Sequence, residues 1–166
     1  SADLVEPAGP TDPEVGVLSV READGRPLAL LANYSLHYVG GVPGGDISAD
    51  YYGVFADRVQ QLLAADRLDP PFVGMMSNGT SGNINNIDFR SPGESQPPYT
   101  QIHIVADALA REAARVALEI EYRDHVTLAM RESSVRLARR STPKDEVARA
   151  KFILSQTKEA QLQGVE

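Results

Sequence analysis

Residues 27–37 read PLALLANYSLH, a nearly continuous apolar run that ends in a short polar segment and a histidine. Such a run, without regular alternation, is typical of a strand that is covered on both faces. Residues 15–20 before it alternate and are rich in Val and Leu, and Asp24 and Gly25 between the two runs are typical of a tight turn. The sequence therefore predicts a β-hairpin with a buried second strand.

The rest of the chain alternates between helical and strand patterns. Helical spacing begins near Ser48, a suitable N-cap, and a short apolar strand is expected over residues 72–76. A long helix is expected over residues 100–122, a long strand over residues 125–138, and a last helix opening at Pro143. This order predicts an α/β fold with a layered mixed β-sheet flanked by helices.

The length of the chain, 166 residues, is enough for one domain with a substantial core. The chain starts at Ser1 rather than at Met, and residues 162–166 leave an amphipathic segment without a stop signal. We therefore interpret residues 1–166 as a single partial domain, an incomplete piece of a longer polypeptide.

The composition excludes several classes of function. A net charge of −7, with no basic stripe, disfavours nucleic acid as a partner. Cysteine is absent, which excludes disulfides, thiol catalysis and cysteine-based zinc sites. No apolar run approaches the roughly 20 residues needed to span a bilayer.

His37 is a candidate metal ligand because it stands where the buried strand runs into the glycine-rich segment 40–45. A neutral imidazole can present one nitrogen to a metal while an acceptor holds the other. A single histidine is more often structural, and no HxH or HExxH pattern accompanies this one. Any further ligands must therefore come from distant positions.

The segment 77–86 crowds hydroxyls, amides and two glycines directly after a predicted strand. Its backbone N–H groups could face a ligand, although an Asx-rich surface loop would have the same composition. The segment lacks the lysine of a phosphate-binding Walker loop, and Ser81 has no neighbouring histidine. Asp50, in the first turn of the predicted helix, either complements the helix dipole or belongs to the site.

Taken together, these segments resemble the N-terminal catalytic domain of the neutral/alkaline, non-lysosomal ceramidases. Residues 31–37 are similar to the family's strand that ends in a zinc-binding histidine, and residues 48–56 match the start of its following helix. Residues 72–78 and 82–86 resemble the strand and the glycine-containing loop that carries its catalytic serine. The resemblance is close over residues 9–86 and looser beyond them.

The resemblance implies a Zn(2+)-dependent amide hydrolase that acts on N-acyl sphingosine or a related N-acyl lipid, with His37 as a zinc ligand. The implied location is extracytoplasmic, with contact to a membrane surface and to the remainder of the parent polypeptide. The residues expected to act in catalysis are Ser81, Gly82, Asn83 and Asn85, and those expected to bind substrate are Asp50 and Asn78.

Two departures from the family pattern leave alternatives open. Asn85 occupies the family's serine position and Asn83 its acidic position, and an amide is neither a nucleophile nor a general base. Ser81 or Thr80 could act from a shifted position, a metal-bound water could attack, or the asparagine-rich loop could bind a polar or carbohydrate ligand without catalysis. A purely structural domain is a third interpretation.

The family's other zinc ligands, a histidine, a glutamate and a tyrosine, have no clear match in this chain. With one ligand of the usual four, these residues alone should not hold zinc tightly. All of these hypotheses require that His37 and the segment 77–86 lie at one shared cleft.

Overall fold

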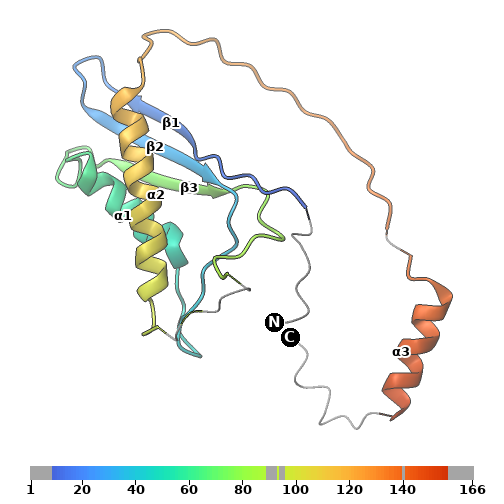
Figure 1. The fold of residues 1–166 in the computed structure, drawn as a ribbon. Helices are drawn as coiled ribbons and strands as arrows, with labels where there is room; N and C mark the ends of the chain where they lie inside the picture. The colour runs from blue at the N-terminus through green and yellow to red at the C-terminus, as the bar shows by residue number, and fades with distance from the viewer. Residues whose placement is uncertain (1–8, 89–92, 94–95, 140, 157–166) are drawn as a thin grey trace. The chain divides into compact units, whose positions relative to one another are not determined.

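The computed structural model describes residues 9–88, 93, 96–139 and 141–156 (Figure 1). The chain divides into two compact units, Ser1–His125 and Val126–Glu166, and each is described by itself. The elements in chain order are β1 (Gly16–Arg21), β2 (Pro27–Tyr34), α1 (Asp50–Leu62), β3 (Val73–Asn78), α2 (Thr100–Glu119) and α3 (Lys144–Gln156).

The first unit contains a three-stranded sheet in the order β1-β2-β3. β1 pairs with β2 in antiparallel, as the predicted hairpin requires, and β2 pairs with β3 in parallel, with Tyr34 opposite Asn78. The predicted fold class is therefore confirmed: the fold is α/β with a mixed, open sheet. Because β2 and β3 run in the same direction, the segments that follow them leave from the same edge of the sheet (Figure 1).

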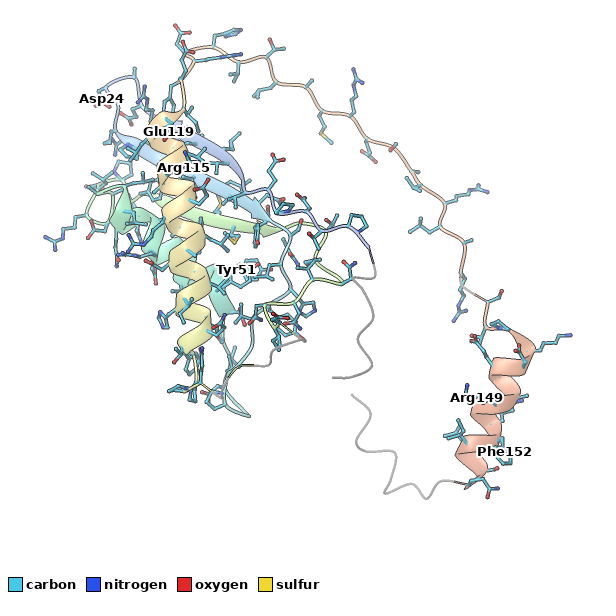
Figure 2. The ribbon with its side chains drawn as sticks, in the orientation of Figure 1. Asp24, Tyr51, Arg115, Glu119, Arg149 and Phe152 are labelled. Atoms are coloured by element: carbon cyan, nitrogen blue, oxygen red, sulfur yellow. The ribbon has the colours of Figure 1, made fainter. Side chains whose placement is uncertain are left out.

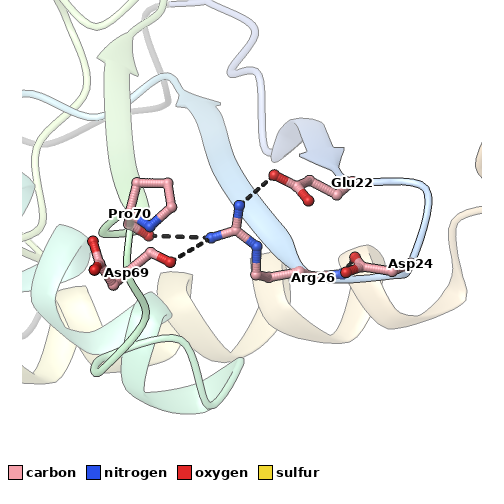
Figure 3. A network of polar contacts seen from close by, with 5 residues as sticks. All are labelled: Glu22, Asp24, Arg26, Asp69 and Pro70. Atoms are coloured by element: carbon pink, nitrogen blue, oxygen red, sulfur yellow. Dashed lines mark hydrogen bonds and ion pairs between the residues drawn. The ribbon is translucent and has the colours of Figure 1, made fainter.

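A clamp around Arg26 fixes the hairpin turn to the segment that leads into β3 (Figure 3). The Arg26 guanidinium donates to the carbonyl oxygen of Asp69 at 3.2 Å and to that of Pro70 at 3.5 Å, and it forms an ion pair with Glu22. Gly25 has φ +94°, a conformation that side chains disfavour. The predicted turn at Asp24 and Gly25 is thus confirmed and linked to the third strand.

The core lies between the sheet and the two helices α1 and α2. Its fully buried members include Leu30, Ala32, Tyr51, Phe55, Val59, Ile102, Ala106, Ala110 and Ala113. An ion pair between Arg58 of α1 and Asp107 of α2, with Nε 2.6 Å from Oδ1, joins the two helices at their solvent side. Hydrogen bonds from Arg111 and then from Arg58 lower the pKa of the Asp107 carboxyl.

The prediction that β2 is covered on both faces is wrong for the part of the chain that is described. Leu30 and Ala32 point to the helices and are buried, whereas Leu31 lies on the other face and is only half-buried. Beside Leu31 on that face are Leu18 of β1 and Met75 of β3, which are 61% and 43% exposed. The apolar run therefore predicted the strand correctly, but it did not predict how many faces of the strand are covered.

The long strand predicted over residues 125–138 is also wrong, since the second unit has no regular structure between residues 126 and 139. Its apolar side chains are exposed, Leu128 by 89%. Alternation shows only that a segment could form a half-buried strand, and a strand also requires a hydrogen-bonded neighbour. The predicted last helix is confirmed as α3, from which Phe152 projects (Figure 2).

The other predicted boundaries are close to the observed ones. α1 starts at Asp50 rather than at Ser48, β3 extends to Asn78, and α2 ends at Glu119.

None of the helices in the described ranges is long and apolar enough to cross a membrane. The assignment of residues 1–166 to a single partial domain stays a prediction.

Candidate functional site

The segments that follow β2 and β3 meet at the edge of the sheet. The backbone N–H of His37 donates to the carbonyl oxygen of Ile84 at 3.2 Å, and that of Gly79 donates to the carbonyl oxygen of Tyr34 at 3.0 Å. The side chain of Asn86 donates to the carbonyl oxygen of Val39 at 3.3 Å. Backbone contacts therefore place His37 next to the asparagine-rich turn, whereas a cleft shared by its imidazole and the turn stays a prediction.

The His37 side chain is half-buried at this junction. Its Nδ1 lies 3.4 Å from the carbonyl oxygen of Tyr38, and the His37 and Tyr38 rings are tilted by 53° with their centroids 4.1 Å apart. A carbonyl acceptor at Nδ1 favours the tautomer with its proton there, which leaves Nε2 as the nitrogen for a ligand. His37 thus has the acceptor near one ring nitrogen that a metal-binding histidine usually has.

A complete zinc site is not formed by the described residues. Zinc in proteins takes three or four protein ligands drawn from His, Cys, Asp and Glu. No three such residues lie close enough together, in the parts of the chain that the structure describes, to hold a metal ion. His37 therefore fits zinc as a single ligand, and the remaining ligands would have to come from elsewhere.

The Asp50 carboxylate holds the loop that follows His37. Asp50 begins α1 with φ +53°, a conformation that aspartate tolerates better than most residues. Its Oδ1 accepts the N–H groups of Val39 at 2.8 Å and Tyr51 at 2.7 Å, and its Oδ2 accepts that of Gly40 at 2.8 Å. These contacts give Asp50 a clear structural role, and its predicted contact with substrate stays a prediction.

Replacing Asp50 with alanine is expected to lower the free energy of unfolding by about 2 kcal/mol, because three backbone N–H groups lose a charged acceptor. Urea denaturation of the purified variant measures this. Asp57→Ala, in the exposed face of the same helix, is the matched control and should change stability by less than about 0.5 kcal/mol. Equal effects of the two substitutions would contradict the role given to Asp50.

Two tyrosines of α1 fix the residue before His37. The hydroxyl of Tyr51, which is fully buried, donates to the carbonyl oxygen of Leu36 at 2.9 Å, and that of Tyr52 reaches the same oxygen at 3.5 Å. Burial, followed by the neighbouring Tyr52, raises the pKa of Tyr51 far above its usual value. The Tyr51 hydroxyl therefore stays neutral and acts as a fixed donor.

The predicted catalytic residues of the turn differ in their access to solvent. Ser81 is only 6% exposed, and its backbone belongs to a tight turn in which the N–H of Ile84 donates to the Ser81 carbonyl oxygen at 3.1 Å. Gly82, Asn83 and Asn85 are exposed in the same turn. Asn78, predicted to bind substrate, ends β3 with an exposed side chain.

Two residues of the junction were missed in the sequence, Asp12 and Ser35. The Ser35 hydroxyl is 2% exposed and donates to Oδ2 of Asp12 at 3.2 Å. It also lies 3.2 Å from Oγ1 of Thr80 and accepts the Thr80 N–H at 3.0 Å. A serine at the end of an apolar run is a weak signal, because it becomes informative only once its partners from other segments are known.

A groove of about 770 Å³ opens beside this junction. Its aliphatic wall comes from Leu36, Ile84 and the α2 residues Ile104, Val105 and Leu109, and amide groups from Asn85, Asn86 and Gln101 stand along it. This volume lies within the range of small-molecule sites, roughly 300–1,000 Å³. The groove can therefore accept a ligand that combines an apolar chain with hydrogen-bonding groups.

The fold and the junction together define an open α/β unit with polar loops gathered at the carboxyl edge of its parallel strands. No protein-family model and no curated protein matches the chain. Among solved structures, it is similar to the crystal structure of neutral ceramidase from Pseudomonas aeruginosa, with 20% sequence identity and a TM-score of 0.45. The similarity covers 66% of this chain and 17% of that chain, so it is a partial likeness of fold.

Proposed function

We propose that this chain contributes one wall of the active site of a ceramidase-like, zinc-dependent amide hydrolase. The substrate would be an N-acyl sphingosine or a related N-acyl lipid, and the remainder of the parent polypeptide would supply the missing zinc ligands. An extracytoplasmic location and contact with a membrane surface belong to the same proposal. The proposal rests on the order of the sequence motifs and on the geometry of the junction.

The observation that carries the proposal is the backbone hydrogen bond between His37 and Ile84, with N 3.2 Å from O. It holds a histidine with an available ring nitrogen against the turn whose sequence resembles the family's catalytic loop. The adjoining groove, with an aliphatic wall and amide groups, suits a substrate that joins an alkyl chain to an amide. When bound, zinc would polarise the scissile carbonyl and activate the attacking group.

Replacing His37 with alanine in the full-length protein is expected to weaken zinc binding about a hundredfold, which is one ligand's share of a four-ligand site. Zinc content after dialysis measures this, and release of fatty acid from an N-acyl sphingosine measures the accompanying loss of hydrolysis. His103→Ala, at an exposed position of α2, is the control and should keep both. Unchanged zinc content in the His37 variant would contradict the assignment.

A second candidate function is binding without hydrolysis. Asn83 and Asn85 stand at the acidic and serine positions of the family loop, and Asn85 lines the groove. An amide both donates and accepts hydrogen bonds, which suits a polar or carbohydrate ligand. A full-length protein that binds such a ligand, yet holds no zinc and releases no fatty acid, would favour this alternative.

A further inference from the structure

One exposed hydroxyl at the junction is connected to a carboxylate through a buried serine. Thr80 is exposed, and its Oγ1 lies 3.2 Å from the Oγ of Ser35, which in turn lies 3.2 Å from Oδ2 of Asp12. The three residues come from separate segments of the chain: the lead-in to β1, the end of β2 and the turn after β3. The sheet therefore brings together a group that no single motif contains.

The directions of these hydrogen bonds follow from the number of protons available. A serine hydroxyl has one proton and two lone pairs, and a carboxylate can only accept. Ser35 gives its proton to Asp12 and accepts the backbone N–H of Thr80 at 3.0 Å. The second lone pair of Ser35 must therefore accept a hydrogen bond from the Thr80 hydroxyl. The lone pairs of Thr80 Oγ1 are then not used in any hydrogen bond to Ser35.

The other hydroxyls of the turn are less suited to attack a substrate. Ser81 is buried, at 6% exposure. Ser77 accepts a hydrogen bond from the Asn33 amide at 2.8 Å and donates to the carbonyl oxygen of Ala32 at 3.4 Å. Thr80 is thus the exposed hydroxyl of the turn whose proton already points at an acceptor.

We propose that Thr80 is the acyl-accepting nucleophile of this site and that Ser35 and Asp12 relay its proton. The inference rests on the proposed function, because it concerns the same amide hydrolysis. Of the two shifted hydroxyls left open by the sequence, Ser81 and Thr80, it selects Thr80, which lies five residues before Asn85 at the family's serine position.

The reaction balances without an external reagent. Thr80 Oγ1 attacks the acyl carbonyl carbon while its proton moves to Ser35 and the Ser35 proton moves to Asp12. The C–N bond then breaks as Asp12 returns its proton to Ser35 and the Ser35 hydroxyl gives a proton to the leaving amine. Water attacks the resulting Thr80 ester in the second half of the reaction, releases the fatty acid and restores the hydroxyl.

The test is acylation of the full-length protein by p-nitrophenyl octanoate, followed by peptide mapping with mass spectrometry. In the parent protein we expect one octanoyl group, attached to Thr80. The Thr80→Val variant should carry no label on the peptide that contains residue 80, and the Thr80→Ser variant should again be labelled there. Ser35→Ala should slow acylation at least tenfold, since general-base assistance contributes about 10²-fold or more. Ser155→Ala, at an exposed position of α3, is the control and should react at the rate of the parent protein.

Acylation at another residue, no acylation at all, or an unchanged rate in Thr80→Val would overturn the inference. Far-ultraviolet circular dichroism of each variant separates loss of reaction from loss of fold, and the Thr80→Ser variant keeps the hydroxyl in place. Failure of the proposed zinc function is recognised separately. In that case zinc is absent and fatty acid is not released from the amide, whereas the activated ester still labels Thr80.

Discussion

Replacing Gly74 with alanine is expected to lower the free energy of unfolding by about 3 kcal/mol, at the upper end of the usual cost of overpacking. A Cβ at this position of β3 would lie 2.8 Å from the carbonyl oxygen of Ala56 and 2.9 Å from Cγ1 of Val59, both in α1. Both are part of a packed helix, so the helix as a whole must move away from the sheet. Urea denaturation followed by circular dichroism measures the change.

Gly16→Ala is the matched control, since it makes the same substitution in β1. There the new Cβ meets only the Cβ of Asn33 at 3.8 Å, an ordinary contact. Gly16→Ala should therefore be neutral or stabilising by up to about 1 kcal/mol, through a less flexible unfolded chain. If both substitutions had the same effect, the close approach of β3 to α1 would be refuted.

Replacing Gly79 with alanine is expected to cost about 3 kcal/mol as well, and to disrupt the candidate site itself. The new Cβ would overlap Oγ of Ser35 and lie 3.1 Å from Oδ1 of Asn33. Because Ser35 is buried, its hydroxyl can only rotate away, and rotation breaks its hydrogen bonds to Asp12 and Thr80. The cost combines overpacking with the loss of these bonds.

Gly82→Ala tests this expectation under matched conditions, because it lies in the same turn and its new Cβ would meet nothing within 4 Å. Chemical denaturation should show a stability loss for Gly79→Ala alone. Acylation by p-nitrophenyl octanoate should also fall at least tenfold in Gly79→Ala. A Gly79 variant as stable as the parent protein would contradict the close contact between the two strand ends.

The sheet was predictable from the sequence where its signals are local. The apolar run 27–34 and the turn at Asp24 and Gly25 contain their own evidence, and both are confirmed. Two features were not predictable: one face of β2 is partly exposed, and residues 126–139 do not form the expected strand. Each depends on which segments lie next to it in space, and alternation or apolarity within one segment does not contain that information.

The candidate site was likewise predictable only in part. The hypotheses drawn from the sequence required His37 and the turn at residues 77–86 to come together, and the observed parallel pairing of β2 with β3 sends both segments to one edge. The sequence did not indicate that Asp50 would be held by backbone N–H groups, that Ser81 would be buried, or that Ser35 would join Asp12 to Thr80. These depend on contacts between residues 10 or more positions apart or on the path of the turn, which composition does not determine.

The claim on which the site depends is that the ends of β2 and β3 are in direct contact, and a disulfide cross-link tests it most directly. The chain contains no cysteine, so a Ser35→Cys/Thr80→Cys variant has a single pair that can join. The Ser35 and Thr80 hydroxyl oxygens are 3.2 Å apart, and a disulfide requires Cα atoms within about 7 Å. The pair should therefore form an intrachain disulfide in most molecules under mild oxidation.

The control is Ala23→Cys/Thr80→Cys, because Ala23 lies in the hairpin turn before the 8-residue strand β2, and that strand is roughly 26 Å long at 3.3 Å per residue. That pair should stay reduced under the same conditions. Quantitative thiol labelling of both variants gives the answer. Cross-linking of the Ser35 and Thr80 pair alone is the predicted result, and free thiols at both positions after oxidation would contradict it.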